Sequence, residues 1–568
     1  MATVSSRLGR GIVTTLAALI LCSQGHSDSP RFVNPILAGG YPDPSICRVD
    51  SDYYLVNSTF EYFPGLPLHH SKDLVNWELV GYGLHRPDQV ISDVNLVDVQ
   101  SDGGIHAPTL RCHKGVFYII TTNVYSPPKK SEPTEFVNFI ITADNIAGPW
   151  SQPHVIEGAP GIDPDLFFDD DGSVWYVGTH TPEIPNFNGE GEIWLQQLDL
   201  GKWALVGERH YLWRGALIGA IWAEGPHLYK RDGRYYLMVA EGGTSFDHAV
   251  TIAVGDAITG PYVGNPRNPI LTSRHLSYDN WVHSTGHADL LELSDGRWYM
   301  VALGVRGDES RGSNMGRETH LVPIVWEREP YPWKTKSEWP VAAPFTGKVE
   351  RYNALPMKEF PQHRKLVFSD NFDSPTLGLQ WNFRRLPIQD IFSLIERPGY
   401  FRLYSNPATP QDRGRASLIG FRQTESDFIY QAKIQFAPAD NNVNAGLSVF
   451  QKDNNYLSYT IVRHGDGYQL ELALASPDKA IALLKRHSLK DYAGQIQLRV
   501  TSKDHRYVYS YSMDDGNTWV EFTKTAADLQ ISRGYTGAYL GFYSTSNGVQ
   551  SKDYMDIDWA NYAAYERH

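Results

Sequence analysis

Five ionisable residues recur at intervals of about sixty residues, each three or four positions before an apolar Ile or Leu. Two of the carboxylates, Asp43 and Glu224, have the chemistry needed to break a glycosidic bond: one carboxylic acid protonates the leaving oxygen, and one carboxylate activates water. Ionised Asp163 near Glu224 would keep the acid protonated by like-charge repulsion, while the base should occupy the more solvated site. The full series is Asp43, His106, Asp163, Glu224 and His287.

Each of these residues is followed by a turn and an aromatic-rich run such as D-Y-Y-L-V or R-W-Y-M-V. A fixed period of strand–turn–strand units is typical of radial repeats, because one unit cannot bury its own apolar faces. We therefore predict an all-β chain with a five-bladed β-propeller over residues 26–345, whose innermost strands bring the series to one funnel. Taken singly, any member of the series is equally well explained as a strand-end residue that caps a loop.

The series falls into two registers. Asp43, Asp163 and His287 stand three residues before the apolar Ile or Leu, whereas His106 and Glu224 stand four before it. We therefore expect Glu224 to project differently from Asp43, as suits an acid and a base on opposite faces of one sugar.

The second half of the chain has a different pattern. Residues 346–365, rich in Pro, Lys and Glu, are predicted to be a linker. From residue 366 to 568 the sequence alternates apolar and polar residues in short runs such as A-G-L-S-V-F-Q, separated by Asp, Asn and Gly turns. This pattern predicts an antiparallel β-sandwich.

Composition limits the partners of the chain. Its 568 residues carry a formal net charge of −13, which argues against nucleic-acid or anionic-membrane binding and favours a neutral or cationic ligand. At the N-terminus, Arg7 and Arg10 precede an apolar stretch over 12–22 and small residues up to Gly25. We predict a signal peptide over residues 1–25 and a secreted, extracellular protein.

Two cysteines, Cys47 and Cys112, remain once the predicted signal peptide containing Cys22 is removed. An oxidising compartment would allow them to pair. They stand one position apart in repeat register, however, and neighbouring positions on a strand point to opposite faces. This register argues against a disulfide, and the sequence leaves open whether the two cysteines pair.

Several strings carry a family resemblance: N-P-I-L-A-G-G-Y-P-D-P-S-I, G-I-D-P-D-L-F-F-D-D-D-G, A-E-G-P-H-L-Y, G-H-A-D-L and M-G-R-E-T. They resemble glycoside hydrolase family 43, in particular β-xylosidases and α-L-arabinofuranosidases with a C-terminal concanavalin A-like sandwich. The resemblance implies a five-bladed propeller and inversion at the anomeric carbon, with Asp43 as general base, Glu224 as general acid and Asp163 as the residue that tunes and orients the acid. Inversion requires acid and base carboxyls about 6.5–9.5 Å apart.

Further positions match the family. Arg317 resembles an arginine that binds the terminal sugar, Phe60 an aromatic wall of that subsite, and Tyr535 an aromatic on a loop that the sandwich lends to the site. A surface salt bridge for Arg317 and core packing for Phe60 are the alternatives. His287 resembles a histidine that holds a hydrated cation in some members, although a hydrogen-bonded structural role is equally open. His106 stands where family members usually have a tryptophan, so the resemblance does not decide which terminal sugar the site selects.

Taken together, these features predict a hemicellulose hydrolase that removes terminal β-1,4-linked xylose from xylo-oligosaccharides. The alternatives are an α-L-arabinofuranosidase acting on arabinoxylan and an inactive carbohydrate-binding propeller. No cofactor is expected to be required. A structural calcium at Asp370, Asp373 and Asp558 is one possibility for the sandwich, solvated strand ends the other. Residues 124–134 and 182–190 are candidate rim loops.

Overall fold

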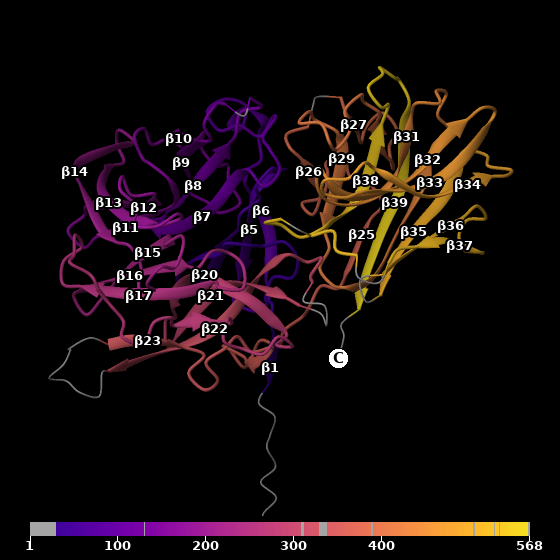
Figure 1. The fold of residues 1–568 in the computed structure, drawn as a ribbon. Helices are drawn as coiled ribbons and strands as arrows, with labels where there is room; N and C mark the ends of the chain where they lie inside the picture. Colours follow the sequence, from indigo (N-terminus) through magenta and orange to yellow (C-terminus); the bar gives the residue numbers. More distant parts are fainter. Residues whose placement is uncertain are drawn as a thin grey trace, which may run out of the picture.

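The protein consists of two all-β lobes (Figure 1). The structure, a computed structural model, describes residues 30–129, 131–307, 312–328, 338–387, 390–503, 506–526, 529–532 and 534–565. The predicted signal peptide lies outside these residues. Within them, the one helical element is the short 3-10 turn η1 (Pro87–Gln89), and no helix is long and apolar enough to cross a membrane.

The first lobe is a β-propeller, as predicted, with five antiparallel sheets of consecutive strands. Blade one contains β2 (Ser45–Val49), β3 (Asp52–Val56), β5 (Gly65–Ser71) and β6 (Glu78–Leu84). Blade two contains β7 (Gly104–His113), β8 (Val116–Tyr125), β9 (Glu135–Ala143) and β10 (His154–Val155). Blade three contains β11 (Ile162–Phe168), β12 (Val174–His180), β13 (Glu192–Asp199) and β14 (Ala204–Trp213). Blade four contains β15 (Glu224–Arg231), β16 (Arg234–Glu241), β17 (Ala249–Gly255), β18 (Val263–Gly264) and β19 (Leu271–Thr272). Blade five contains β20 (Val282–Glu292), β21 (Trp298–Arg306), β22 (Arg317–Arg328) and β23 (Glu338–Ala342).

The innermost strand of every blade carries a left-handed residue three positions before the apolar Ile or Leu of the repeat, except in blade one, where this residue lies two positions before β2. The φ angles at these five positions lie between 37° and 56°. In four of the five strands the pairing register also shifts next to this position, as happens at a β-bulge. The five residues are Asp43, Ala107, Asp163, Gly225 and His287.

This backbone feature explains the two registers of the sequence. Asp43, Asp163 and His287 occupy the left-handed position itself, whereas His106 and Glu224 come one residue earlier. A bulge turns the side chains beside it away from the regular alternation of a strand. It therefore directs residues from both registers into the same space at the propeller axis.

Beneath that space, one polar network joins the innermost strands of all five blades. Arg111 in β7 forms ion pairs with Asp165 in β11 at 2.9 Å and with Asp289 in β20 at 3.0 Å. Ser45 in β2 donates a hydrogen bond to Asp289 at 2.7 Å, and Tyr229 in β15 donates another at 2.6 Å. Both aspartates are fully buried, so the guanidinium supplies the countercharge that buried carboxylates need.

The two cysteines form a disulfide, so the register argument against their pairing was wrong. Cys47 in β2 and Cys112 in β7 are bonded, with a Cα–Cα distance of 6.1 Å. Neighbouring blades of a propeller face each other with opposite sheet faces. An offset of one position between successive repeats therefore brings the two sulfurs into the same inter-blade space, where both residues pack in one apolar cluster.

The second lobe is the predicted antiparallel β-sandwich, and its core lies between two sheets. One sheet contains, in spatial order, β27 (Phe392–Ser393), β28 (Phe401–Tyr404), β39 (Tyr554–Tyr565), β30 (Asp427–Gln435), β35 (Gln495–Lys503), β36 (Arg506–Ser512) and β37 (Val520–Lys524), with β25 (Val367–Asp370) also paired to β39. The other contains β34 (Ala482–Leu489), β33 (Gly467–Ala475), β32 (Asn455–His464), β31 (Asn444–Lys452), β38 (Tyr539–Thr545), β29 (Ser417–Arg422), β26 (Asn382–Arg384) and β4 (Tyr62–Phe63).

Where the two lobes meet, a strand from one lobe pairs with a strand of the other. Strand β4 belongs in sequence to the first blade, yet it pairs with β26 and so forms the edge of a sandwich sheet. Within the predicted linker, β24 (Tyr352–Ala354) pairs with β1 (Arg31–Val33) near the start of the described chain. Arg306 of the propeller forms a 2.7 Å ion pair with Glu425 of the sandwich. The sandwich is therefore docked on the propeller.

Candidate active site

The whole predicted series lines one cavity of about 260 Å³ at the propeller axis. Phe60, Arg317 and Tyr535 also line it, so every residue predicted to contact the sugar or the reacting groups is brought together. Tyr535 comes from the sandwich and the others from the propeller. The site is therefore formed by both lobes.

Asp43 is held as a carboxylate by its neighbours. It is 4% exposed, and burial on its own would raise its pKa. Burial is the largest single effect, but the Arg317 guanidinium, His287 and the Ser58 hydroxyl together outweigh it and hold the pKa of Asp43 below its usual value. Arg317 donates to both carboxylate oxygens, at 2.9 and 3.3 Å, and Ser58 donates at 2.7 Å.

Glu224 has the opposite environment, because burial raises its pKa well above the usual value and the charges of Asp163 and Asp43 raise it further. Burial and Asp43 also raise the pKa of Asp163, whose carboxylate accepts a 3.1 Å hydrogen bond from the Gly225 N–H. Asp163 therefore ionises less readily than expected. The expectation of a more solvated base was also wrong: Glu224 is partly exposed to the cavity and Asp43 is buried.

Three rings form one wall of the cavity. Phe60 meets His106 edge to face at 4.7 Å between ring centroids, and Tyr535 lies 5.3 Å from Phe60 and 5.9 Å from His106. The Arg317 guanidinium lies over the Tyr535 ring at 5.1 Å and over the Phe60 ring at 5.5 Å. Arg317 thus lies in the cavity and not at the surface, whereas Phe60 lines the cavity and is also packed in the core, with 1% of its surface exposed.

His106 presents a hydrogen-bond acceptor to this wall. Its Nε2 lies 3.1 Å from the backbone carbonyl of Asp102, and burial lowers its pKa to about 4, so the ring is neutral at neutral pH. A carbonyl only accepts, so Nε2 carries the hydrogen and Nδ1 keeps its lone pair. No described residue donates to Nδ1. A tryptophan, whose indole only donates, would offer no such acceptor.

Asp102 also fixes the loop that carries Tyr535. Its carboxylate accepts the Tyr535 N–H at 3.1 Å and pairs with Lys452 at 2.9 Å. Arg317 Nε donates to the Tyr535 carbonyl at 3.0 Å. A side chain at Gly534 would not fit, because a Cβ there would lie 2.3 Å from the Asp102 carboxylate. The backbone N–H and the backbone carbonyl of Tyr535 are thus both hydrogen-bonded to the propeller.

The positions considered for metal binding do not form a metal centre: within the described residues, no group of three or more His, Cys, Asp and Glu could hold an ion. His287 is 7% exposed, and burial lowers its pKa to about 4. Asp370 accepts hydrogen bonds from the Phe372 N–H and the Trp381 indole, and Asp558 lies 3.4 Å from the Lys433 ammonium. Within the described part of the chain, these groups therefore do not gather as direct ligands around one ion.

Sequence reasoning missed several residues of the cavity. Ser58 binds Asp43, Thr244 accepts a 2.9 Å hydrogen bond from Arg317, and Trp222 and Phe136 line the mouth. Ser58 and Trp222 each stand two positions before a predicted site residue, which was a usable signal. Thr244 and Phe136 belong to segments without any repeat motif, and only the fold brings them here.

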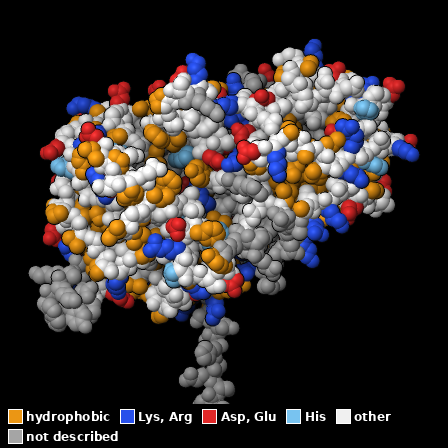
Figure 2. All heavy atoms as spheres, viewed as in Figure 1, with side chains coloured by type: hydrophobic (Ala, Val, Ile, Leu, Met, Phe, Trp, Pro, Cys, Tyr) orange, Lys and Arg blue, Asp and Glu red, His pale blue; other side chains and the backbone are white. Residues whose placement is uncertain are grey.

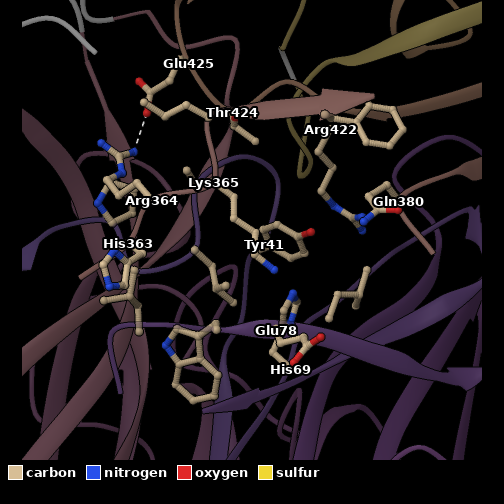
Figure 3. Close-up of a pocket in the computed structure, with 18 of the residues that line it drawn as sticks. Tyr41, His69, Glu78, His363, Arg364, Lys365, Gln380, Arg422, Thr424 and Glu425 are labelled. Atoms are coloured by element: carbon tan, nitrogen blue, oxygen red, sulfur yellow. Dashed lines mark hydrogen bonds and ion pairs between the residues drawn. The ribbon is translucent and has the colours of Figure 1, made fainter. Parts of the chain in front are cut away.

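A separate cavity of about 310 Å³ lies at the seam between the lobes (Figure 3). The side chains of Tyr41, His69 and Arg422 line it, and Glu425 forms an ion pair with Arg364. None of the five residues of the repeated series lines it. The propeller-axis cavity is therefore the candidate active site.

A five-bladed propeller with carboxyls of opposite pKa shift in one axial cavity has the features of a glycosidase. The sequence model of the family described as Glycosyl hydrolases family 43 matches residues 32–332. A second model, described as Beta xylosidase C-terminal Concanavalin A-like domain, matches residues 369–563. The chain belongs to glycosyl hydrolases family 43.

Individual relatives match nearly the full length. A Butyrivibrio fibrisolvens protein named xylosidase/arabinosidase is 37% identical, covering 93% of this chain and 98% of the relative. A non-reducing end alpha-L-arabinofuranosidase of Bacteroides ovatus is 34% identical, covering 94% of each. The solved structure of a xylan beta-1,4-xylosidase from Bacillus halodurans superposes with a TM-score of 0.83 at 30% identity, covering 94% of this chain and all of that one.

Proposed function

We propose that this glycosidase removes terminal β-1,4-linked xylose from xylo-oligosaccharides with inversion at the anomeric carbon. Asp43 acts as general base, Glu224 as general acid, and Asp163 orients the acid and raises its pKa. The observation that carries this assignment is the opposite shift of two carboxyls in one cavity: the pKa of Asp43 is lowered and that of Glu224 is raised. One group is ready to accept a proton while the other is ready to donate one.

The reaction then needs no group beyond the chain and water. Glu224 donates its proton to the glycosidic oxygen as the bond to the anomeric carbon breaks. A water molecule attacks that carbon from the opposite face and gives its proton to Asp43. Exchange with solvent returns Glu224 to the acid and Asp43 to the carboxylate.

The sugar itself is held by the remaining residues of the cavity. Phe60 and Tyr535 offer apolar ring surface, Arg317 offers donors beside Asp43, and His106 accepts from a sugar hydroxyl. A neutral pentose fits this mixture of apolar surface and a few directed polar groups.

A second candidate is removal of α-L-arabinofuranose from arabinoxylan. The relatives named above include a dual xylosidase/arabinosidase and an arabinofuranosidase. His106 favours keeping this option, since its acceptor nitrogen changes which hydroxyl pattern the wall can satisfy.

We also propose that the protein is exported. Two features support export: the N-terminal pattern of Arg7, Arg10 and the apolar stretch over 12–22, and the Cys47–Cys112 disulfide, a bond typical of oxidising compartments. N-terminal sequencing of protein recovered from the culture medium should begin near residue 26, whereas an intact N-terminus on protein retained in cells would contradict export.

The substrate assignment is tested with p-nitrophenyl β-xylopyranoside, p-nitrophenyl α-L-arabinofuranoside and xylobiose. We expect the xyloside to have the higher kcat/KM, and Glu224→Gln to slow xylobiose hydrolysis by about 10²–10⁴-fold, the usual contribution of a general acid. Proton NMR of the p-nitrophenyl β-xylopyranoside reaction, in which all xylose comes from the cleaved glycoside, should show α-xylose as the first product.

A faster reaction with the arabinofuranoside would select the second candidate. First release of β-xylose would contradict inversion. If wild-type protein cleaved no glycoside and only bound xylo-oligosaccharides, the chain would be a carbohydrate-binding propeller.

A further inference from the structure

The seam cavity shown in Figure 3 carries more positive charge than its own carboxylates neutralise. Arg364, Lys365 and Arg422 all line it. Glu425 lines it too, but its carboxylate is engaged by Arg364 at 2.5 Å and by Arg306 at 2.7 Å. Within the described part of the chain, Lys365 and Arg422 form no ion pair with a carboxylate. Two cations of the lining therefore lack a countercharge.

Arg422 is a buried cation held by neutral groups. The residue is 6% exposed. Its Nε donates to the Gly40 carbonyl at 2.9 Å, and its Nη1 donates to the side-chain oxygen of Asn382 at 2.9 Å. The guanidinium also lies 4.4 Å from the centre of the Tyr41 ring. Dipoles and a ring face offset only part of the free energy that is lost when a charge leaves water, so an anion beside this group would be stabilising.

His69 stands between the two unpaired cations and stays neutral. It is 3% exposed, and its ring meets the Tyr41 ring edge to face at 5.0 Å between centroids. Burial, followed by the charges of Arg422 and Lys365, lowers the pKa of His69 to about 3. Its buried Nδ1 has no hydrogen-bond partner among the described residues. The protein alone therefore leaves both charge and hydrogen-bonding capacity unsatisfied at this wall.

The general surface of the protein does not attract anions. The formal net charge of the chain is −13, and Figure 2 shows Lys and Arg side chains scattered among Asp and Glu on the face in view. Glu78, the remaining carboxylate of the cavity lining, is exposed. Selection of an anion would have to come from the local pair Lys365 and Arg422.

We propose that the seam cavity binds a small organic acid, with its carboxylate between Lys365 and Arg422 and its carbon body along Tyr41 and Trp77. An ammonium and a guanidinium are the strongest hydrogen-bonding partners of a carboxylate in proteins. The volume of about 310 Å³ is far more than a carboxylate alone requires and falls in the range of small-molecule sites. The site contains none of the proposed catalytic residues, so it goes beyond the proposed glycosidase function.

A ligand in this cavity would join three parts of the chain. Tyr41 and His69 belong to the propeller, Lys365 ends the predicted linker, and Arg422 ends β29 of the sandwich. Binding that requires all three in their native arrangement stabilises the folded, docked form over the unfolded chain. The expected sign of occupancy is a melting temperature that rises with ligand concentration and then saturates.

The test uses D-glucuronate and D-xylose, which share a sugar ring and differ in the carboxylate. Thermal unfolding and titration calorimetry are run at constant ionic strength, because added salt alone screens exposed charges. We expect D-glucuronate to stabilise the wild-type protein and Lys365→Ala to weaken its binding about tenfold or more, as for the loss of a charge-assisted hydrogen bond. Lys365→Arg, which keeps the charge, should recover most of the affinity. Lys365 is exposed, so the variants should fold.

Lys358→Ala is the matched control, because Lys358 is an exposed lysine of the same predicted linker and does not line the cavity. It should leave glucuronate binding unchanged, and any stabilisation by D-xylose should be equal in wild type and Lys365→Ala. Glucuronate binding that survives Lys365→Ala, or no glucuronate binding in wild type, would overturn the site. Stabilisation by inorganic phosphate but not by glucuronate would overturn the assignment to an organic acid. None of these outcomes depends on whether the protein cleaves xylosides.

Discussion

At the scale of single residues, one left-handed backbone position decides how the site is built. It recurs in all five blades, within or just before the innermost strand, and is occupied by Asp or His in three and by Ala or Gly in two. Asp and His adopt this conformation more readily than most residues, so three strands place the functional side chain on it. In the other two, His106 and Glu224 come one position earlier. The side chains of the proposed acid and base therefore start from different backbone positions within the repeat.

The contrast in pKa leads to a pH prediction for Asp163→Asn. The charge of Asp163 raises the pKa of Glu224 on top of burial, so removing it should lower that pKa. Glu224 would then lose its proton at lower pH, and the alkaline limb of kcat/KM for xylobiose should move to lower pH. The acid limb should stay in place because Arg317, Ser58 and His287 set the pKa of Asp43. An alkaline limb that is unmoved or moves upward would contradict this role.

The five-residue series shows what a sequence repeat reveals at this scale. Its members could be found because each blade repeats the same strand, and a shared axis follows from that repetition. The charged partner of Asp43 and the burial of Asp163, which set the pKa of these two carboxyls, cannot be inferred from the repeat. Arg317 reaches Asp43 from the opposite end of the propeller sequence, and the burial of Asp163 depends on its packing in the folded chain.

At the scale of elements, the polar network around Arg111 joins five strands that share no sheet. Each blade contributes at least one side chain to it, with His227 of β15 also 3.0 Å from the Arg111 guanidinium, and the two aspartates have no exposed surface. The packed faces between blades are apolar and tolerate sliding, but directional hydrogen bonds to one guanidinium define a single arrangement. The network lies two to four residues after the left-handed positions, so it fixes the strands directly beneath the active site.

Removing the Arg111 guanidinium should therefore destabilise the propeller strongly. We expect Arg111→Ala to reduce the free energy of unfolding by about 3–5 kcal/mol, because Asp165 and Asp289 would remain buried without a countercharge. Denaturant unfolding followed by tryptophan fluorescence measures it. The control is Arg328→Ala: its ion pair with Glu338 is at the surface, and the Arg328 side chain is 86% exposed, so its loss should cost at most about 1 kcal/mol. Equal costs would contradict a special role for the network.

The disulfide between two blades and the short strand β4 show where inference from the sequence failed. The repeat of about sixty residues predicted the blades, and alternation with a period of two predicted the sandwich, because each of its strands buries one face. The same rule misjudged Cys47 and Cys112, since it was applied within one repeat and not across two facing blades. Strand β4 is only two residues long, too short for any period to be seen, and its partner β26 is far away in sequence.

At the scale of the whole molecule, the sandwich completes the sugar site. Tyr535 is one of the three rings of the cavity wall, and its peptide is bound by Asp102 and Arg317 of the propeller. Asp102 also binds Lys452, on a second strand of the sandwich. Under the proposed function, the affinity for the terminal sugar should therefore depend on how the lobes are joined.

This coupling predicts the behaviour of Asp102→Ala. Without the carboxylate the Tyr535 N–H and Lys452 lose their acceptor, and the ring should no longer be held against the sugar. We expect KM for p-nitrophenyl β-xylopyranoside to rise about tenfold, as for the loss of a charge-assisted hydrogen bond, with kcat changed much less. Asp102→Asn retains an acceptor for the N–H and should recover part of the loss. A fall in kcat with KM unchanged would contradict a positioning role.

The pairing of β4 with β26 also has a consequence for biosynthesis. Phe63 and Phe383, which face each other in this pair, are separated by about 320 residues, and a ribosome adding about 5–20 residues per second needs roughly 16–64 s to make them. During that interval the first blade emerges with a segment whose partner strand has not yet been made. Neither lobe reaches its final form as an independent translation product, so the enzyme is completed only after the ribosome has passed well into the second half of the message.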